Sequence, residues 1–543
     1  MSNDFLDKLR NFVYIICILL FLKPTLILPI QILNNPQEYE LTAYRLQQYD
    51  IGTHSLGSKL WKFQFDGVLH IDNLSQKCGV IFWKDFMKAN FKSIISQDNG
   101  ALLIIIPQNI DNLPSVDKEL MMEFENFFKN VYTNLAIFFV EDSKYVQYFI
   151  SKMQEVTIVD DSYPSQLINF IFNNVYQLST SNNLPTNLMK EVKMKNLLGS
   201  LSSGDELNPI ILFVAYYDSH SIIPGLSVSA NSNGSGVATL LELLVIFSKF
   251  YECDKTTPQY NMMFVLTDGG KYNYQGTRQL LDDLYEKKNE QNIELVICLD
   301  SLAKKSNINI HLSKSPSEKS ATFRFIKNLR LVSNSSTNIK TVSKKINLNH
   351  YKLAWEHERY NIRKIPAITL SNIDAFDSPE RDSIFDVPST LSVKTLLDNI
   401  KLISDAIALY VFNIPFESCQ KMGIDCSMFN NSIMSEERVS TFLSIINSYS
   451  RAPARSQENL ISQLQIIVEK YSKQNVVISD FNPVDINLYS VLEDKITIYR
   501  TKSTAFDVLL AVVISLYLLF LKYVVKNVQK YLVITFAYFS ERK

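Results

Sequence analysis

The stretch Ile210–Tyr251 constrains the possible fold more than any other part of the chain. It opens with an uninterrupted apolar run, Ile210–Tyr216, which is typical of a strand buried on both faces of a parallel sheet. A polar loop and the Gly-rich turn Ser232–Gly236 follow, and the segment Val237–Tyr251 then has helical spacing. Sites in open α/β sheets form beyond the carboxyl ends of the strands, so we expect a functional site in this loop.

Strand and helix patterns alternate through residues 205 to about 412. The sequence therefore predicts an α/β fold in which helices cover both faces of a mostly parallel sheet. The predicted strands are Ile210–Tyr216, Asn261–Leu266, Leu295–Leu299, Ile308–Leu312 and Ala367–Leu370, and the predicted helices are Val237–Tyr251, Thr277–Lys287, Ala321–Leu331 and Val393–Phe412.

A separate α/β lobe is predicted for residues 36–195, so the region is two-lobed. The apolar runs Leu102–Pro107 and Leu135–Val140 have the length of buried strands. Between them, Leu120–Val131 has apolar residues at helical spacing, which indicates a helix packed on the same core.

The second α/β domain is predicted to span residues 196–414. Residues 415–504 follow, with helical patterns at Val439–Ile446 and Leu460–Tyr471 and a short alternating strand at Lys495–Arg500. Because this part leads directly to an apolar segment, we interpret it as a stalk.

Two apolar segments bracket the chain. Within residues 1–35, Lys8 and Arg10 precede the short apolar run Phe12–Leu22, which is typical of a secretory signal. The apolar character continues to Leu33 without a clear small-residue cleavage site. A retained N-terminal anchor is therefore the alternative.

Residues 505–525 are apolar and long enough to span a bilayer. The positive-inside rule places the basic tail, residues 526–543, in the cytosol. The large middle part, with its stalk, then lies in a lumen or outside the cell. Three sequons agree with that placement and are candidate glycosylation sites: Asn73, Asn334 and Asn430.

Charge and cysteine content exclude some classes of protein. The formal net charge of −1 and the absence of a long basic block give no reason to expect a nucleic-acid partner. Six cysteines in 543 residues are too few for a disulfide scaffold. Cys419 and Cys426 are close enough in sequence to pair in an oxidising compartment, and isolated thiols are the alternative.

The second domain resembles the zinc aminopeptidase family, which also includes glutamate carboxypeptidase and the transferrin receptor ectodomain. The likeness rests on Tyr216-Tyr217-Asp218 after the first strand, the turn Ser232-Asn233-Gly234-Ser235-Gly236, and Asp300 after a later strand. Enzymes of this family hold two zinc ions with His, Asp, Glu, Asp and His, and a further Glu is the general base. The resemblance implies their fold.

At most of the corresponding site positions this chain has a different residue. Tyr216 stands where the family has a His ligand, and Ser232 stands where it has the bridging Asp. The two Glu residues would fall within Thr267–Lys271, which contains the vestigial positions Gly270 and Lys271 and keeps neither Glu. Even if Asp268 is placed in register, the second acid is missing. The last His falls in a segment without histidine that contains Asp382.

One acid of the ligand set, Asp300, remains, and Asp218 belongs to the supporting residues. With one ligand and no general base, two-zinc hydrolysis has no physical route. We therefore predict no catalytic residue, no metal and no cofactor. His220 and His357 are conceivable substitute ligands, although a lone His is more often a hydrogen-bonded core or surface residue. The vestigial site positions are Tyr216, Asp218, Ser232, Gly270, Lys271, Asp300 and Asp382.

Longer blocks resemble the nicalin family, which has a more distant relative in nicastrin, the γ-secretase subunit. The blocks occur in the same order over almost the whole chain, including the final apolar segment. They are Tyr44–Asp50, Ser232–Val237, Gly269–Thr277, Lys344–Leu348, Ala354–Arg359 and Ala505–Val512.

The nicalin resemblance implies a non-catalytic scaffold in the endoplasmic reticulum membrane, single-pass with a large lumenal domain. Its implied partners are a Nodal modulator-like protein, a small seven-span membrane protein, the Sec translocon and the ribosome, during multipass membrane protein biogenesis. A link to Nodal signalling is also implied. The alternatives are a metallo-aminopeptidase with unusual ligands and a nicastrin-like substrate receptor of a membrane protease. Trp355–Arg359 is either a contact surface or a core Trp with solvated neighbours.

Overall fold

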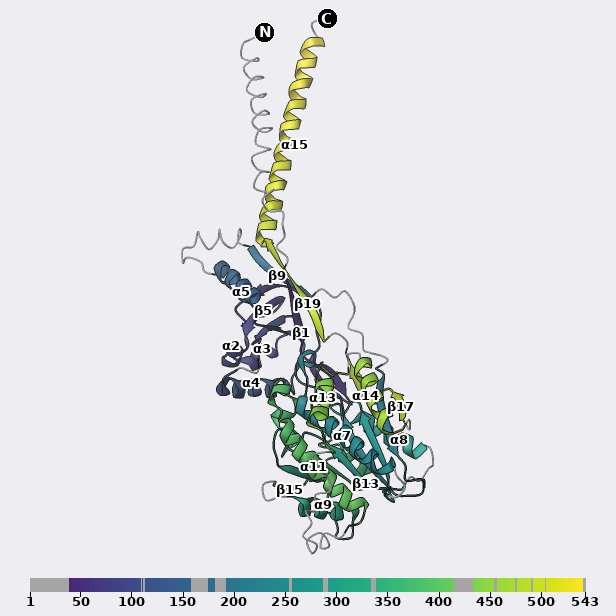
Figure 1. The fold of residues 1–543 in the computed structure, drawn as a ribbon. Coiled ribbons are helices and arrows are strands. Elements are labelled where there is room, and N and C mark those ends of the chain that lie inside the picture. Colours follow the sequence, from purple (N-terminus) through teal and green to yellow (C-terminus); the bar gives the residue numbers. More distant parts are fainter. Residues whose placement is uncertain are drawn as a thin grey trace.

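The protein is represented by a computed structural model (Figure 1). The signal or anchor segment, Asn334, Asn430 and the pair Cys419 and Cys426 lie outside the residues that it describes, so predictions about them stay predictions. The described residues are 39–108, 110, 113–157, 174–180, 192–252, 256–286, 292–333, 338–414, 433–453, 457–473, 476–489, 492–502 and 504–540.

An eight-stranded sheet forms the centre of the larger lobe, in the order β15-β14-β16-β13-β11-β12-β10-β17. The inner strands β12, β11, β13 and β16 are mutually parallel, which confirms the predicted sheet. β10 runs antiparallel to both of its neighbours, and β14 runs antiparallel to β16. The strands are β10 (Met194–Leu201), β11 (Ile210–Tyr216), β12 (Asn261–Thr267), β13 (Ile293–Leu299), β14 (Ile308–Leu312), β15 (Ile339–Ser343), β16 (Ala367–Ser371) and β17 (Val476–Phe481).

Helices cover both faces of this sheet because β11 buries alternate side chains on opposite sides. Phe213 and Ala215 pack into a core with α7, α9, α11, α13 and α14, whereas Leu212 and Val214 face a second core with α8 and α10. Every residue of α7 is buried, so its sequence is apolar all round. The helices are α7 (Gly236–Ser248), α8 (Gln275–Glu286), α9 (Ala321–Val332), α10 (His357–Ile362), α11 (Val393–Val411), α13 (Glu436–Ile446) and α14 (Glu458–Tyr471).

The smaller lobe is built on a closed barrel, in the order β1-β19-β9-β4-β5-β6-β8, with β1 also paired to β8. The strands are β1 (Tyr39–Arg45), β4 (Gln64–Val68), β5 (Lys77–Phe82), β6 (Ala101–Ile106), β8 (Ala136–Glu141), β9 (Asn174–Thr180) and β19 (Glu493–Lys502). Its helices are α2 (Trp83–Lys88), α3 (Phe91–Ile95), α4 (Ser115–Phe128) and α5 (Lys144–Thr157). A four-stranded sheet has the order β18 (Ile486–Leu488), β2 (Gln48–Ile51), β3 (His54–Ser58) and β7 (Tyr132–Thr133).

The interpretation of residues 415–504 as a stalk is wrong for the part that the structure describes, which starts at residue 433. Helices α13 and α14 pack against α7 in the main core. Strand β17 extends the large sheet, β18 pairs with β2, and β19 closes the barrel between β1 and β9. The segment returns to both lobes because each of its strands satisfies a sheet edge that would otherwise be unpaired.

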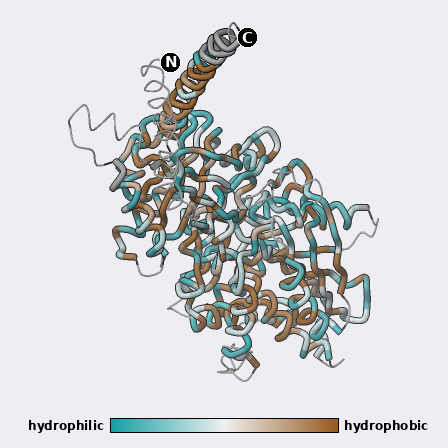
Figure 2. Tube along the Cα trace, turned by 90° about the horizontal axis from the view of Figure 1, so that it is seen from above, coloured by the Kyte–Doolittle hydropathy of each residue, from teal (hydrophilic) through white to brown (hydrophobic). Residues whose placement is uncertain are grey.

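A long apolar helix, α15 (Thr504–Ser540), begins immediately after β19 and extends away from both lobes (Figure 1). Among the described residues, two helical stretches are long and apolar enough to cross a membrane. One, Ala230–Glu252, is mostly buried in the core, whereas Ala505–Val528 is not buried at all. Figure 2 shows this apolar helix apart from the lobes, which fits the predicted membrane span.

Arg451 holds the segment after α13 against the loop that follows β11. Its guanidinium is buried and donates to the carbonyl oxygens of Tyr217 at 2.6 Å, Ile446 at 2.8 Å and Ser229 at 3.0 Å. These bonds join the C-terminal part of the chain to the loop at the carboxyl end of β11.

We expect Arg451→Met to lower the free energy of unfolding by about 3 kcal/mol, because buried carbonyl groups lose their donors. Denaturant unfolding of the full chain in a nonionic detergent measures the change. Arg330→Met on the exposed face of α9 is the matched control, with an expected change below about 0.5 kcal/mol. Equal stability of the two variants would contradict this role of Arg451.

Candidate functional site

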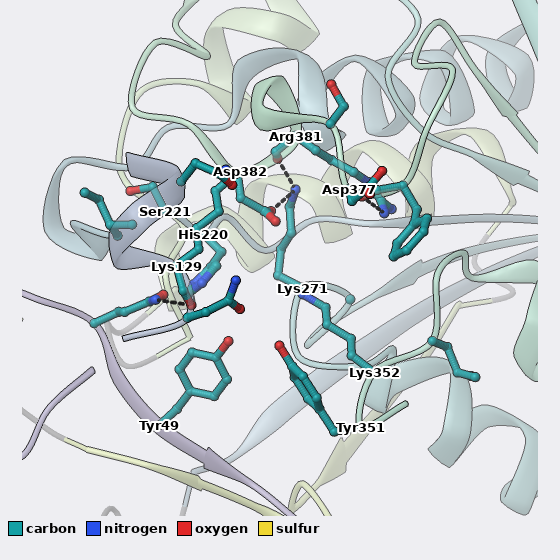
Figure 3. Close-up of a pocket in the computed structure, with 18 of the residues that line it drawn as sticks. Tyr49, Lys129, His220, Ser221, Lys271, Tyr351, Lys352, Asp377, Arg381 and Asp382 are labelled. Atoms are coloured by element: carbon teal, nitrogen blue, oxygen red, sulfur yellow. Dashed lines mark hydrogen bonds and ion pairs between the residues drawn. The ribbon is translucent and has the colours of Figure 1, made fainter. Parts of the chain in front are cut away.

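A cavity of about 290 Å³ lies between the two lobes, beyond the carboxyl ends of β11 and β12 (Figure 3). The smaller lobe supplies β2 and the end of α4, and the larger lobe supplies the loops after β11, β12 and β16 and the segment before α10. The sequence-predicted loop is therefore one wall of the site. Charged and aromatic lining residues include Tyr49, Lys129, His220, Lys271, Tyr351, Lys352, Phe376, Asp377, Arg381 and Asp382.

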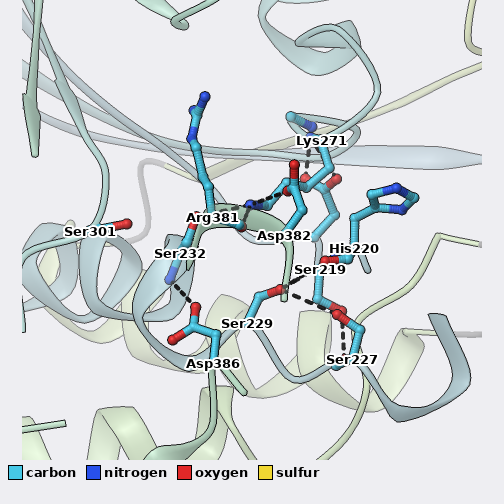
Figure 4. Close-up of polar contacts among 12 residues, drawn as sticks. Ser219, His220, Ser227, Ser229, Ser232, Lys271, Ser301, Arg381, Asp382 and Asp386 are labelled. Atoms are coloured by element: carbon cyan, nitrogen blue, oxygen red, sulfur yellow. Dashed lines mark hydrogen bonds and ion pairs between the residues drawn. The ribbon is translucent and has the colours of Figure 1, made fainter. Parts of the chain in front are cut away.

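Lys271, in the loop between β12 and α8, points its ammonium group into a polar pocket beside this cavity (Figure 4). The Nζ atom donates to Ser232 Oγ at 2.8 Å, to the Arg381 carbonyl oxygen at 2.6 Å and to Asp382 Oδ1 at 2.9 Å. All three ammonium protons are thus used. Burial opposes the charge of Asp382, but Lys271 and Lys352 outweigh it and hold the pKa of Asp382 well below its usual range.

Arg381, whose carbonyl oxygen accepts from Lys271, also forms an ion pair with Asp300 through its guanidinium group. Its Nη2 atom lies 2.9 Å from Asp300 Oδ2 and 3.0 Å from the Tyr274 hydroxyl. The Tyr216 hydroxyl lies 3.4 Å from the other oxygen of Asp300. The predicted remnant acid is therefore held by a guanidinium and a phenol, and it is 2% exposed.

Asp218 orders the loop that carries Lys271. Its two carboxylate oxygens accept from the backbone N–H groups of Gly270 at 2.7 Å and Lys271 at 2.9 Å. Burial raises the pKa of Asp218 to about 6, although these donors favour its charged form. Asp218 therefore fixes the backbone of the loop between β12 and α8.

Gly270 has no room for a side chain, because the ring of Tyr216 lies against its backbone. A Cβ atom at residue 270 would be 2.1 Å from Cγ of Tyr216. A glutamate at this position is incompatible with Tyr216 in its present place. The residues at positions 216 and 270 are thus coupled sterically.

The two histidines considered as substitute ligands lie in separate, buried environments. His220 Nδ1 is 3.2 Å from the Tyr272 hydroxyl, and His357 Nδ1 is 2.9 Å from Thr369 Oγ1. Burial lowers the pKa of each ring to about 3, so both are neutral. Within the ranges that the structure describes, no three His, Cys, Asp or Glu side chains are grouped to hold a metal ion.

Trp355 belongs to the core and is not a contact surface. It is 2% exposed, and its ring stacks on His311 at 3.9 Å between centroids. The Arg381 guanidinium lies 4.3 Å from the same ring. Sequence reasoning did not assign Tyr49, Lys129, Tyr351 and Lys352 to the site, although Tyr49 lies in the block Tyr44–Asp50, and all four reach the cavity from other segments.

The class of protein follows from this fold and this loop arrangement. Residues 196–406 match the family described as Peptidase family M28. The crystal structure of the gamma-secretase component Nicastrin has a TM-score of 0.53 at 10% identity, covering 85% of this chain and 99% of that chain. The chain thus has an M28 peptidase-like α/β fold, and it carries an apolar helix that is long enough to cross a membrane.

Curated relatives define the family more closely. Nicalin of Caenorhabditis elegans is 32% identical, over 93% of this chain and 94% of its own length. The BOS complex subunit ncln of Danio rerio is 30% identical, over 97% and 96%, and the human BOS complex subunit NCLN is 29% identical, over 88% of each chain. The chain belongs to the nicalin family, which confirms the resemblance found in its sequence.

Glu125 of α4 joins the smaller lobe to the wall of the site. Its buried carboxylate accepts from the Ser383 hydroxyl and, at 2.8 Å, from the backbone N–H of Ile384. Burial raises the pKa of Glu125 to about 7 despite these two donors. The folded protein therefore keeps a proton that the unfolded chain loses near pH 4.5.

This contribution to stability is complete below about pH 4 and is lost as the pH rises through 7. We expect the free energy of unfolding to fall between pH 5 and 8, and Glu125→Gln to reduce that fall by up to about 3 kcal/mol. Denaturant unfolding at several pH values measures it. Exposed Glu123→Gln on the same helix is the control. An unchanged pH slope in Glu125→Gln would show that the raised pKa is wrong.

Proposed function

We propose that this chain is a non-catalytic scaffold subunit of a BOS-type complex in the endoplasmic reticulum membrane. The observation that carries the proposal is the similarity over almost the whole chain to relatives named as BOS complex subunits. The similarity includes the region of both lobes and the C-terminal apolar helix, so it concerns the shape of the whole protein and not one domain.

The polar pocket around Lys271 supports the non-catalytic part of the proposal. Ser232 and Asp382 stand at two of the vestigial positions, and the ammonium group of Lys271 lies between them. The buried ammonium group would repel two zinc ions placed beside it. The side chains around that group offer a metal only the hydroxyl of Ser232 and the carboxylate of Asp382 as ligands. The residues present therefore do not fit a metal pair.

The anchoring of the lobes supports a membrane scaffold. α15 follows β19 after one residue, and β19 is paired on both edges within the barrel. A body fixed so closely to its membrane helix presents its surfaces at a set height above the bilayer. We place that body in the lumen with a short cytosolic tail, because of the basic residues after the span. Asn73, at an exposed position, is a proposed glycosylation site.

We expect purified full-length protein to contain far less than one zinc ion per chain and to lack chelator-sensitive aminopeptidase activity. Elemental analysis and a peptide hydrolysis assay measure the two quantities, with an active zinc aminopeptidase as the control. One or more tightly bound zinc ions per chain, or peptide cleavage at an ordinary enzymatic rate, would establish the metallo-aminopeptidase alternative.

Affinity purification of the full chain in mild detergent tests the scaffold. We expect mass spectrometry to find a Nodal modulator-like protein, a small seven-span membrane protein, and Sec translocon and ribosome components involved in multipass membrane protein biogenesis. An unrelated single-span glycoprotein of the same orientation is the control. A polytopic aspartyl protease in their place would support a nicastrin-like receptor, and absence of the Nodal modulator-like protein would contradict the scaffold.

Any role in Nodal signalling is tested separately, by depleting the chain and measuring the signal.

A further inference from the structure

The cavity between the lobes is lined by four cationic side chains, Lys129, Lys271, Lys352 and Arg381, and by two carboxylates, Asp377 and Asp382. Its two carboxylates are already engaged, since Asp382 pairs with Lys271 and Asp377 interacts electrostatically with Lys344 outside the cavity. Arg381 is likewise paired with Asp300. These pairs leave the other cationic side chains of the cavity without a carboxylate.

Lys352 is the principal one of these cations. Lys352 lines the cavity, and no hydrogen bond or ion pair to its Nζ atom occurs within the described part of the chain. Burial and the nearby charges of Lys271 and Arg381 lower the pKa of Lys352 to about 8, against the attraction of Asp382. A partly buried ammonium without a partner is costly, and an anion bound beside it would remove that cost.

Two tyrosine hydroxyls add neutral donors on the same wall. Figure 3 shows the hydroxyl groups of Tyr49 and Tyr351 pointing into the cavity between Lys129 and Lys352. Neither hydroxyl bonds to another residue in the ranges that the structure covers. Lys129, from the end of α4, donates to the carbonyl oxygen of Pro379 at 3.3 Å. A carbonyl group carries no formal charge, so this bond does not neutralise the ammonium group of Lys129.

We propose that this cavity binds a small organic molecule with a compact oxyanion, a carboxylate or a phosphate. The oxyanion accepts from Lys352 and from the hydroxyls of Tyr49 and Tyr351, and Lys129 adds a longer-range attraction. The organic part packs on the rings of Tyr351 and Phe376. The volume of about 290 Å³ admits a ligand no larger than one or two amino-acid residues. Binding here joins the two lobes, because residues of both line the cavity.

The site is separate from the proposed scaffold role, so each can fail without the other. Titration calorimetry on the full chain in a nonionic detergent tests it with three probes: N-acetyl-phenylalanine, its neutral amide, and inorganic phosphate. We expect at least one of the two anions to bind and the amide not to bind. The anion that binds identifies the headgroup. Equal binding of the acid and the amide, or no binding of either anion at 10 mM, would overturn the proposal.

Variants test the residues. We expect Lys352→Gln to weaken anion binding by about tenfold or more, and Lys129→Gln to weaken it several-fold. Exposed Lys340→Gln on β15 is the matched control and should leave the affinity unchanged. Thermal unfolding without ligand shows whether each variant is folded. If folded Lys352→Gln and Lys129→Gln both bind the anion as tightly as the unmodified chain, the assignment is wrong.

Discussion

The buried ammonium of Lys271 is the constraint on which the site depends. A charge removed from water is tolerated only where its hydrogen-bonding capacity is satisfied, and Lys271 meets this condition with partners from two other loops. Asp218 fixes the backbone of its own loop. The carboxyl end of the sheet is consequently held by a lysine-centred hydrogen-bond network.

The C-terminal part of the chain links the apolar helix α15 to both lobes. The C-terminal part of the chain contributes a strand to each of the three sheets before it enters the membrane helix. β19 precedes α15 and pairs with β1 and β9, which attaches α15 to the barrel. Earlier in the same C-terminal part, α13 and α14 pack on α7 in the larger lobe. The apolar helix is therefore connected to both lobes through paired strands and packed helices.

The local elements could be predicted because buried strands and helices have distinct periodicities. Ile210–Tyr216 and Ile308–Leu312 are strands with the expected bounds, and the helix predicted at Val393–Phe412 ends one residue earlier. The sequence also predicts the vestigial positions, and the structure adds the contacts of these residues. These contacts could not be predicted, since nothing in the order of residues indicates that Lys271 reaches Ser232 and Asp382, or that Lys352 faces the same cavity.

By itself, the sequence determined the α/β class, the long C-terminal apolar helix and the family, because apolar periodicity and short motifs are local properties. Only the tertiary structure decided that the predicted stalk is part of both lobes. Pairing between β1 and β19 joins opposite ends of the described chain, and such pairing depends on which edges remain open after the rest has folded. The charge of the cavity also depends on the tertiary structure, because the cationic and anionic side chains that line it come from loops of both lobes.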